Sequence, residues 1–245
     1  MRNVTVWIWL LFVAAPGWAV DCAALKFRGQ GYTACTVDVR HDDIRLFLRA
    51  PGAAPYGDFS ALNAALAQQN LTLSFAMNAG MYHPDRSPVG YYVEQGMTQM
   101  RLLTRASGGN FGLLPNGVIC VTDQTIEVIE TLKFAARNLA CRFASQSGPM
   151  LVIDGALHPR FLKDSRSRYI RNGVGMRAGG RQAIFVMSNS FVTLHEFASF
   201  FKDHIGVAQA LYFDGNASRL FALQLGRNDP GRRMGPIIGT VVPKP

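Results

Sequence analysis

Residues 210–218 read Ala-Leu-Tyr-Phe-Asp-Gly-Asn-Ala-Ser, and the expected fold is organised around this stretch. Its apolar run is typical of a buried strand, and it stops at an acid, a glycine and small polar residues, as a tight turn requires. Three other apolar runs stop in the same way: 71–77 before Asn78-Ala79-Gly80, 150–153 before Asp154-Gly155, and 183–187 before Ser188-Asn189-Ser190. We therefore expect four neighbouring strands whose polar ends converge on one crevice, where open α/β sheets bind ligands. The alternative is that each end is an ordinary turn, because turns favour these residue types.

The composition indicates a globular chain with a substantial core. Hydrophobic residues make up 49% of the 245 residues and charged residues 17%, which excludes wholesale disorder. The formal net charge is +9, from 25 Lys and Arg against 16 Asp and Glu. A basic protein favours acidic partners, namely phosphates, nucleic acid, anionic polysaccharide or a membrane surface, and the charge does not choose among them.

The N-terminus has the pattern of a secretory signal peptide. A basic start, Met1-Arg2, precedes the apolar segment 4–15, and Gly17-Trp18-Ala19 supplies small residues for cleavage after Ala19. Asp21 stands where a lipoprotein signal needs a small residue, so lipidation is disfavoured. We expect residues 1–19 to be removed and residues 20–245 to form a single domain, secreted or periplasmic, with no later transmembrane segment.

Export would give the cysteines an oxidising environment. Cys22, Cys35, Cys120 and Cys141 are even in number and allow three pairings. The nearest-neighbour pairing, Cys22 with Cys35 and Cys120 with Cys141, is favoured because each bond closes a local loop. Zinc binding is the rival use, and it is disfavoured because no Cys-x-x-Cys pair occurs.

The remaining periodicity predicts an α/β (α+β) fold, with a mixed β-sheet, flanking helices and site loops at the C-terminal ends of strands. A helix is expected from Asp58, a short one at 132–140, and another opened by a capping box of Thr193 and Glu196. Further strands are expected at 32–39, 44–48, 89–94, 111–114, 118–122, 125–129 and 237–242.

Two segments between these elements are candidates for a binding site. Residues 78–96 carry Tyr82, His83, Asp85 and Arg86 in a loop that either lines a pocket or is an ordinary surface loop. Residues 158–171 hold five cations against one acid, and they lead into Asn172-Gly173. Most charge runs are solvated faces, but here Arg side chains and turn amides could clamp an anionic group.

Carboxylates are the best candidates for catalysis. The sequence contains no His-Glu-x-x-His, P-loop, Gly-x-Ser-x-Gly or dinucleotide-binding motif, and no histidine stands at a strand end. The positioned acids are Asp214, Asp154 and Glu94.

Four segments occur in an order that resembles the phosphodiester glycosidase family. They are Asn78-Ala-Gly-Met-Tyr82, Ser147-Gly-Pro-Met-Leu-Val-Ile-Asp-Gly155, Arg171-Asn-Gly-Val-Gly-Met176 and Leu211-Tyr-Phe-Asp-Gly-Asn-Ala-Ser218. The resemblance spans about residues 32–242. It implies a hydrolase that removes a sugar from a sugar-phosphate diester, and it implicates Asn78, Gly80, Asp154, Arg171, Asp214 and Ser218. Ala79 and Asn216 stand where the family has glycines, which bears on the substrate more than on the fold.

The chemistry of such a reaction gives the residues their expected roles. Cleavage at the sugar carbon needs charge stabilisation on the phosphate, and a carboxylate that activates water or attacks the anomeric carbon. We expect Asp214 or Asp154 to be that carboxylate and Arg171 to hold the phosphate. Asn78, Gly80, Asn172, Asn216 and Ser218 are the expected substrate-binding residues. No cofactor is required, although paired acids beside a phosphate could attract a divalent cation.

The rival hypothesis is a non-catalytic envelope module that binds anionic or phosphorylated glycan. It accounts for the basic charge but not for two strand-end Asp residues, since carboxylates weaken anion binding. Nucleic-acid binding is disfavoured by the expected export and by the absence of a recognisable motif. The natural substrate and the oligomeric state are left open.

Overall fold

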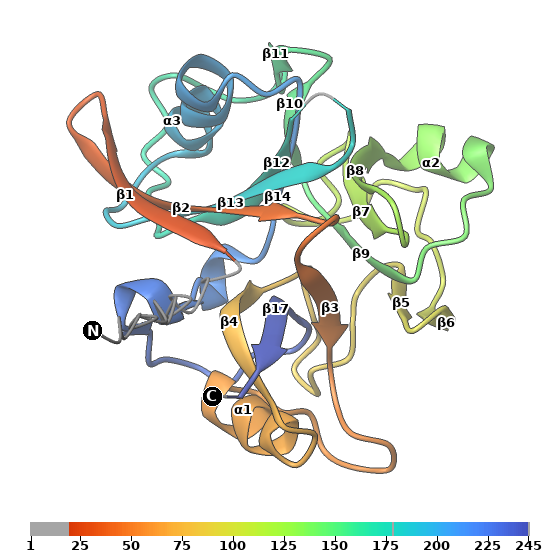
Figure 1. Ribbon diagram of the computed structural model, residues 1–245. Helices are drawn as coiled ribbons and strands as arrows, with labels where there is room; N and C mark the ends of the chain where they lie inside the picture. The colour runs from red at the N-terminus through yellow and green to blue at the C-terminus, as the bar shows by residue number, and fades with distance from the viewer. Residues whose placement is uncertain (1–19, 178, 245) are drawn as a thin grey trace, which may run out of the picture.

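The computed structural model describes residues 20–177 and 179–244. Within this range, only the backbone of Asn216 is described, not its side chain. The expected signal peptide lies outside these residues. No helix in the described part of the chain is long and apolar enough to cross a membrane. Within it the strands form three antiparallel sheets, each with a helix against it (Figure 1). The α+β class is therefore confirmed.

The first sheet is the largest and carries the stretch around Asp214. Its strands, in spatial order, are β1 (Asp21–Phe27), β2 (Gln30–Asp38), β13 (Gln182–Ser188), β12 (Asn172–Met176), β14 (Gln209–Tyr212), β10 (Met150–Ile153) and β11 (Ala156–Leu157). β13 and β14 both pair antiparallel with β12, so they run in the same direction and end at the same edge. β10 pairs antiparallel with β14 and therefore ends at the opposite edge.

The second and third sheets have five strands each. The second contains β16 (Arg227–Asn228), β15 (Leu220–Ala222), β4 (Leu71–Asn78), β17 (Ile237–Pro243) and β3 (Asp43–Phe47). The third contains β6 (Met97–Met100), β5 (Tyr92–Glu94), β9 (Phe143–Ser147), β7 (Gly117–Val121) and β8 (Ile126–Glu130). Residues 111–114, expected as a strand, form turns instead, because Asn116 donates its side-chain amide back to the Phe111 carbonyl.

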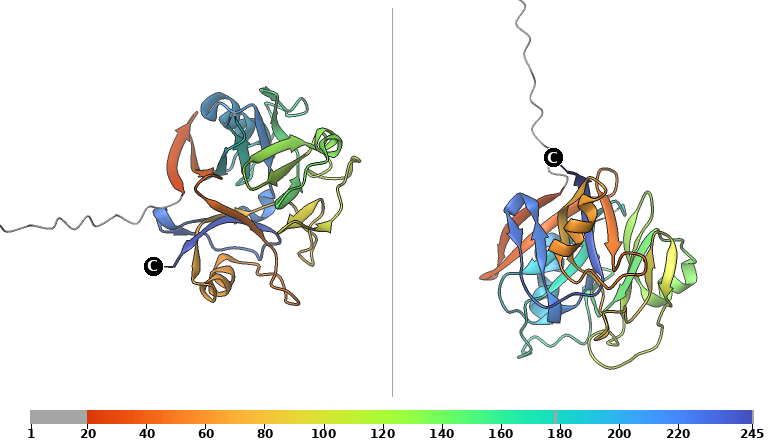
Figure 2. Two further views of the ribbon diagram at one scale, coloured as in Figure 1. Left: turned by 45° about the vertical axis from the view of Figure 1, so that its right-hand side comes forward. Right: turned by 90° about the horizontal axis from the view of Figure 1, so that it is seen from below.

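One face of each sheet contributes to a shared core, and the other face is covered by a helix. Phe75 of β4 and Phe185 of β13 meet in this core with ring centroids 5.0 Å apart. The helices are α1 (Phe59–Ala67) on the second sheet, α2 (Thr131–Arg137) on the third, and α3 (Leu194–Ser199) on the first, continued by a π-helical turn (Phe200–Ile205). In Figure 1 they lie at the periphery, with α3 at the upper left, α2 at the right and α1 at the bottom, and α1 lies in front when the molecule is seen from below (Figure 2, right).

Several local predictions are confirmed by the structure. Asp58 caps α1, and Thr193 and Glu196 form a reciprocal capping box at the start of α3. Disulfides join Cys22 to Cys35 and Cys120 to Cys141, as expected for a chain that folds in an oxidising compartment.

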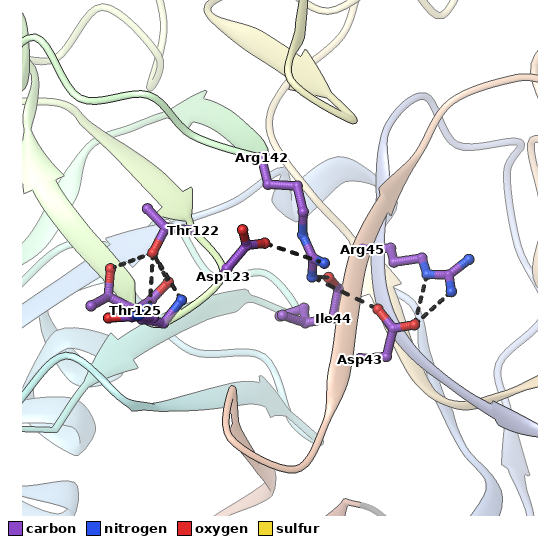
Figure 3. Close-up of polar contacts among 8 residues, drawn as sticks. Asp43, Ile44, Arg45, Thr122, Asp123, Thr125 and Arg142 are labelled. Atoms are coloured by element: carbon purple, nitrogen blue, oxygen red, sulfur yellow. Dashed lines mark hydrogen bonds and ion pairs between the residues drawn. The ribbon is translucent and has the colours of Figure 1, made fainter.

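Arg142, directly after the second disulfide, joins the second and third sheets at the surface. Its guanidinium lies between Asp123, at 3.6 Å, and Asp43 of β3, at 3.8 Å (Figure 3). It also donates to the Ile44 carbonyl. Because these ion pairs are exposed, each contributes only about 0–1 kcal/mol, and the shared core holds the sheets together.

Candidate functional site

The polar ends of β4, β13 and β14, three of the four expected to converge, lie close together. The side chains beside them form a hydrogen-bonded cluster beneath the Asp214 turn. Asn78 ends β4 and donates its side-chain amide to the Asp214 carbonyl oxygen at 2.8 Å. Asn172 begins β12, next to the end of β13, and donates to both oxygens of Asn78 at 3.1 Å. Both asparagines are fully buried. The expectation of four neighbouring strands is therefore wrong, because β4 belongs to the second sheet and β10 ends at the opposite edge of the first. The expected convergence holds for three strand ends only.

The same polar cluster holds the turn that follows β14. Ser218 donates its hydroxyl to the Ile170 carbonyl at 3.0 Å and to the Asn172 side chain at 3.2 Å. The backbone amide of Arg219 donates to the Asn78 side chain at 3.1 Å. Asn78, Asn172 and Ser218 therefore fix residues 213–219 from below, and the contacts described for their side chains are with protein groups.

Gly80 and Gly215 allow two close approaches that a side chain would prevent. The Gly80 amide donates to the Ser145 hydroxyl, and a Cβ at Gly80 would lie 2.4 Å from the Gln146 carbonyl oxygen. A Cβ at Gly215 would lie 1.8 Å from the Tyr212 hydroxyl oxygen. These glycines set the backbone path of the two loops that flank the site.

Asp214 lines a surface hollow with a volume of about 280 Å³. The hollow is lined by Tyr82, His83, Pro84, Arg86, Asp214 and Arg232. The Arg86 guanidinium lies 5.4 Å from the centroid of the Tyr82 ring. Burial and the Asp214 charge raise the pKa of the Tyr82 phenol, against the opposing effect of nearby arginines. The hollow thus combines one carboxylate with two cations at a half-buried aromatic ring.

The sequence predicted only part of this lining. The loop at 78–96 was predicted either to line a pocket or to be an ordinary surface loop, and its residues Tyr82, His83 and Arg86 do line this hollow. Arg232 was missed, and its only signal was its place in a basic, turn-rich segment after β16. Arg219 holds that segment in place by donating to the carbonyl oxygens of Asp229 and Arg232.

Arg171, the expected phosphate clamp, does not line the hollow. Its side chain is 1% exposed and donates to the Val192 carbonyl, the Tyr212 hydroxyl and the Ser167 carbonyl at 2.8, 3.1 and 2.9 Å. The guanidinium is therefore used to tie β14 to the two loops beside it. Its contacts fit a positioning role beneath the Asp214 turn.

Asp154 and Glu94 lie away from Asp214, so the expectation of paired acids is wrong. Because β10 is antiparallel to β14, Asp154 lies at the opposite edge of the sheet, 62% exposed, with Lys133 at 2.9 Å. Those contacts lower the pKa of the Asp154 carboxyl. Glu94 lines a separate hollow of about 420 Å³, where burial raises its pKa and the Tyr92 hydroxyl donates to it at 2.8 Å.

The remaining expectations concern Asn216 and a metal ion. The side chain of Asn216 is outside what the structure describes. Within residues 20–177 and 179–244, no three His, Cys, Asp or Glu side chains gather as a group that could hold a metal ion.

Comparison with known proteins places the chain in a family. The phosphodiester glycosidase profile matches residues 72–241, which include all of β4 except Leu71, β14 and the Asp214 turn. The chain belongs to the phosphodiester glycosidase family. This family member is 31% identical over 216 residues to the uncharacterized protein YigE of Escherichia coli (strain K12), covering 87% of this chain and 84% of YigE.

Solved structures support the same fold. One is the catalytic domain of zebrafish N-acetylglucosamine-1-phosphodiester alpha-N-acetylglucosaminidase, auto-inhibited by its pro-peptide. It aligns with a TM-score of 0.61 at 13% identity, over 90% of this chain and 81% of that chain. A putative exported protein from Burkholderia pseudomallei aligns with a TM-score of 0.57 at 11% identity, over 86% of this chain and 74% of that chain. At these identities the likeness concerns the fold alone.

Proposed function

We propose that this protein is a glycosidase that hydrolyses the bond between the anomeric carbon and the phosphate oxygen of a sugar 1-phosphodiester. The observation that carries the proposal is the hollow in which Asp214 faces the same space as Arg86 and Arg232. Family membership supports the reaction type. Export to the periplasm or the medium is part of the proposal, and the two disulfides agree with it.

The arrangement suits a phosphate leaving group. Most glycosidases use two carboxylates, one of which protonates the leaving oxygen. A phosphate monoester is a weak base and leaves without that proton, so a single carboxylate suffices. Among the described residues that line the hollow, Asp214 is the carboxylate, which agrees with this requirement.

In the proposed reaction, Asp214 either takes a proton from the attacking water or attacks the anomeric carbon itself. The bond from that carbon to the phosphate oxygen breaks, and its electron pair leaves with the phosphate. Arg86 and Arg232 stabilise the charge that develops on the phosphate oxygens. When Asp214 acts as the base, water supplies the hydroxyl of the released sugar, and Asp214 passes the proton to the phosphate monoester or to solvent. When Asp214 attacks, water then attacks the anomeric carbon of the glycosyl–Asp214 ester, the bond to Asp214 breaks with its electron pair returning to the carboxylate, and the water proton leaves to the phosphate monoester or to solvent.

The first test compares two matched carboxylate variants on UDP-N-acetylglucosamine and on simple sugar 1-phosphodiesters. Asp214→Asn should lower kcat by about a thousandfold or more, in the range expected for a lost acid-base or nucleophilic group. Asp154→Asn, at the opposite edge of the sheet, should keep wild-type kcat. Equal activity of Asp214→Asn and the wild type would refute the assignment, provided that both unfold at the same temperature.

A second test addresses the cations. Arg86→Gln and Arg232→Gln should each weaken substrate binding or turnover by about ten- to a hundredfold, since each removes a charge-assisted contact worth about 1.5–3 kcal/mol. The loss should be larger for phosphodiesters than for an uncharged aryl glycoside of the same sugar. An equal loss on both substrates would contradict a role in phosphate recognition.

The alternative function is a module that binds anionic glycan without cleaving it. The two cations of the hollow favour this alternative, whereas the Asp214 carboxylate beside them disfavours it, because it repels an anion. Saturable binding of a phosphorylated glycan with no product in either EDTA or divalent-cation buffer would favour the module.

A further inference from the structure

Apolar side chains are exposed on a basic loop beside the site and on the segment bonded to it. Among the described residues, three of the large exposed hydrophobic side chains lie on the loop 158–171, here called the basic loop, or on the segment bonded to it. They are Leu162, Tyr169 and Phe191, which are 66%, 50% and 64% exposed. The backbones of Tyr169 and Val192 bond in both directions, at 3.1 and 2.9 Å, so Phe191 is held next to the loop.

The basic loop is anchored, so this exposure belongs to an ordered surface. His158 is buried and stacks on Phe161, with ring centroids 4.7 Å apart. Arg168 donates to the Phe191 carbonyl at 3.1 Å and to Glu196 of α3 at 2.7 Å. Burial and stacking of His158 at one end and the hydrogen bonds of Arg168 at the other thus hold the loop, while Leu162 and Phe191 still face solvent.

The charge of this surface is strongly positive. Arg160, Lys163 and Arg166 are exposed on the basic loop, where Asp164 is the single acid. Glu196, five residues after Phe191, is already paired with Arg168. Cations beside exposed Leu and aromatic side chains are typical of proteins that lie on anionic membranes. A soluble polyanion would be attracted by the cations, but Leu162 and Phe191 would add little to its binding free energy.

We propose that Leu162, Tyr169 and Phe191, with Arg160, Lys163 and Arg166, form a docking face for an anionic lipid bilayer. The face adjoins the candidate site, because Ile170 at the end of the basic loop accepts the Ser218 hydroxyl beneath the Asp214 turn. Docking does not depend on the reaction. Combined with the proposed function, it favours a sugar phosphodiester whose second alcohol is a membrane lipid.

The test is co-sedimentation of the mature chain with vesicles. Vesicles of equal parts phosphatidylcholine and phosphatidylglycerol should bind the wild type, and vesicles of phosphatidylcholine alone should bind it at least tenfold more weakly. The triple variant Arg160→Gln, Lys163→Gln, Arg166→Gln should lose about a hundredfold in affinity, at roughly fivefold per cation. Leu162→Ser with Phe191→Ser should lose about tenfold or more, from lost insertion of apolar surface.

Matched controls remove similar groups from elsewhere on the molecule. A triple variant of Arg101, Arg105 and Lys244 to Gln loses the same charge, and Leu132→Ser on α2 loses another exposed leucine, at 58% against 66% for Leu162. Both should bind anionic vesicles within about twofold of the wild type. Each apolar position is also tested singly, with thermal unfolding to verify the fold.

Three results would overturn the proposal. The first is no binding of the wild type to anionic vesicles. The second is an equal loss in the control variants, which would indicate attraction by net charge alone. The third is wild-type affinity in the Leu162 and Phe191 variants together with full displacement by soluble dextran sulfate, which would indicate a polyanion surface. None of these readouts depends on hydrolysis, so the proposed function is tested separately.

Discussion

Replacing Arg171 by methionine tests whether this residue positions the Asp214 turn or contacts substrate. Its guanidinium is buried and makes three hydrogen bonds, to Val192, Tyr212 and Ser167. Methionine keeps part of the volume but leaves the Val192 carbonyl and the Tyr212 hydroxyl, both buried, and the part-buried Ser167 carbonyl without this donor. Each loss costs about 1–3 kcal/mol, and removing a buried charge offsets part of the sum, so we expect a net destabilisation of about 3 kcal/mol.

The assay is thermal unfolding of the mature protein with its disulfides intact. For a chain of this size, 1 kcal/mol shifts Tm by roughly 2–4 °C, so Arg171→Met should lower Tm by about 6–12 °C. Arg105→Met, at an exposed position, should change stability by less than about 0.5 kcal/mol. An unchanged Tm in Arg171→Met, with phosphodiester binding lost, would refute the positioning role and support the phosphate clamp.

Two further substitutions test the packing and the electrostatics of the fold. Gly215→Ala should destabilise the protein by about 1–3 kcal/mol and lower activity, because the new Cβ would meet the Tyr212 hydroxyl. The control is Gly108→Ala, where a Cβ would have open space. Equal Tm values for the two variants would contradict the close approach at Gly215. Asp42 is buried with one oxygen unpartnered, and burial raises its pKa from 3.8 to about 6. Between about pH 4 and pH 6 the folded chain holds a proton on Asp42 that the unfolded chain has released. The contribution of Asp42 to the free energy of unfolding therefore falls as the pH rises from 4 to 6. Asp42→Asn should remove this fall. The free energy of unfolding of the variant minus that of the wild type should therefore be greater at pH 8 than at pH 4, by up to about 3 kcal/mol. An equal difference at both pH values in urea unfolding would contradict this.

The sequence was most informative where the cause of the structure is local. The capping box at Thr193 and Glu196 depends on residues three apart, and the two disulfides close short loops. The strand ends at Asn78 and Asp214 were also predictable, because an apolar run followed by turn residues has few alternatives.

The errors arose where the cause is non-local. Asp154 follows the same kind of strand as Asp214, and only the antiparallel pairing of β10 with β14 sends it to the opposite edge. Arg171 ends a basic segment whose sequence predicts an exposed side chain. In the structure its guanidinium is instead buried and donates to three acceptors from separate segments, on Val192, Tyr212 and Ser167. Arg232 reaches the hollow through a loop that Arg219 fixes by contacts no local pattern encodes.

The measurement that tests the central claim most directly is the site of bond cleavage. Mature protein would be incubated with UDP-N-acetylglucosamine and sugar 1-phosphodiesters in oxygen-18 water, and the products analysed by mass spectrometry. The proposed glycosidase predicts label in the released sugar and none in the phosphate, with no product from Asp214→Asn. Label in the phosphate would mean attack at phosphorus, and it would contradict the role given to Asp214 and to the hollow around it.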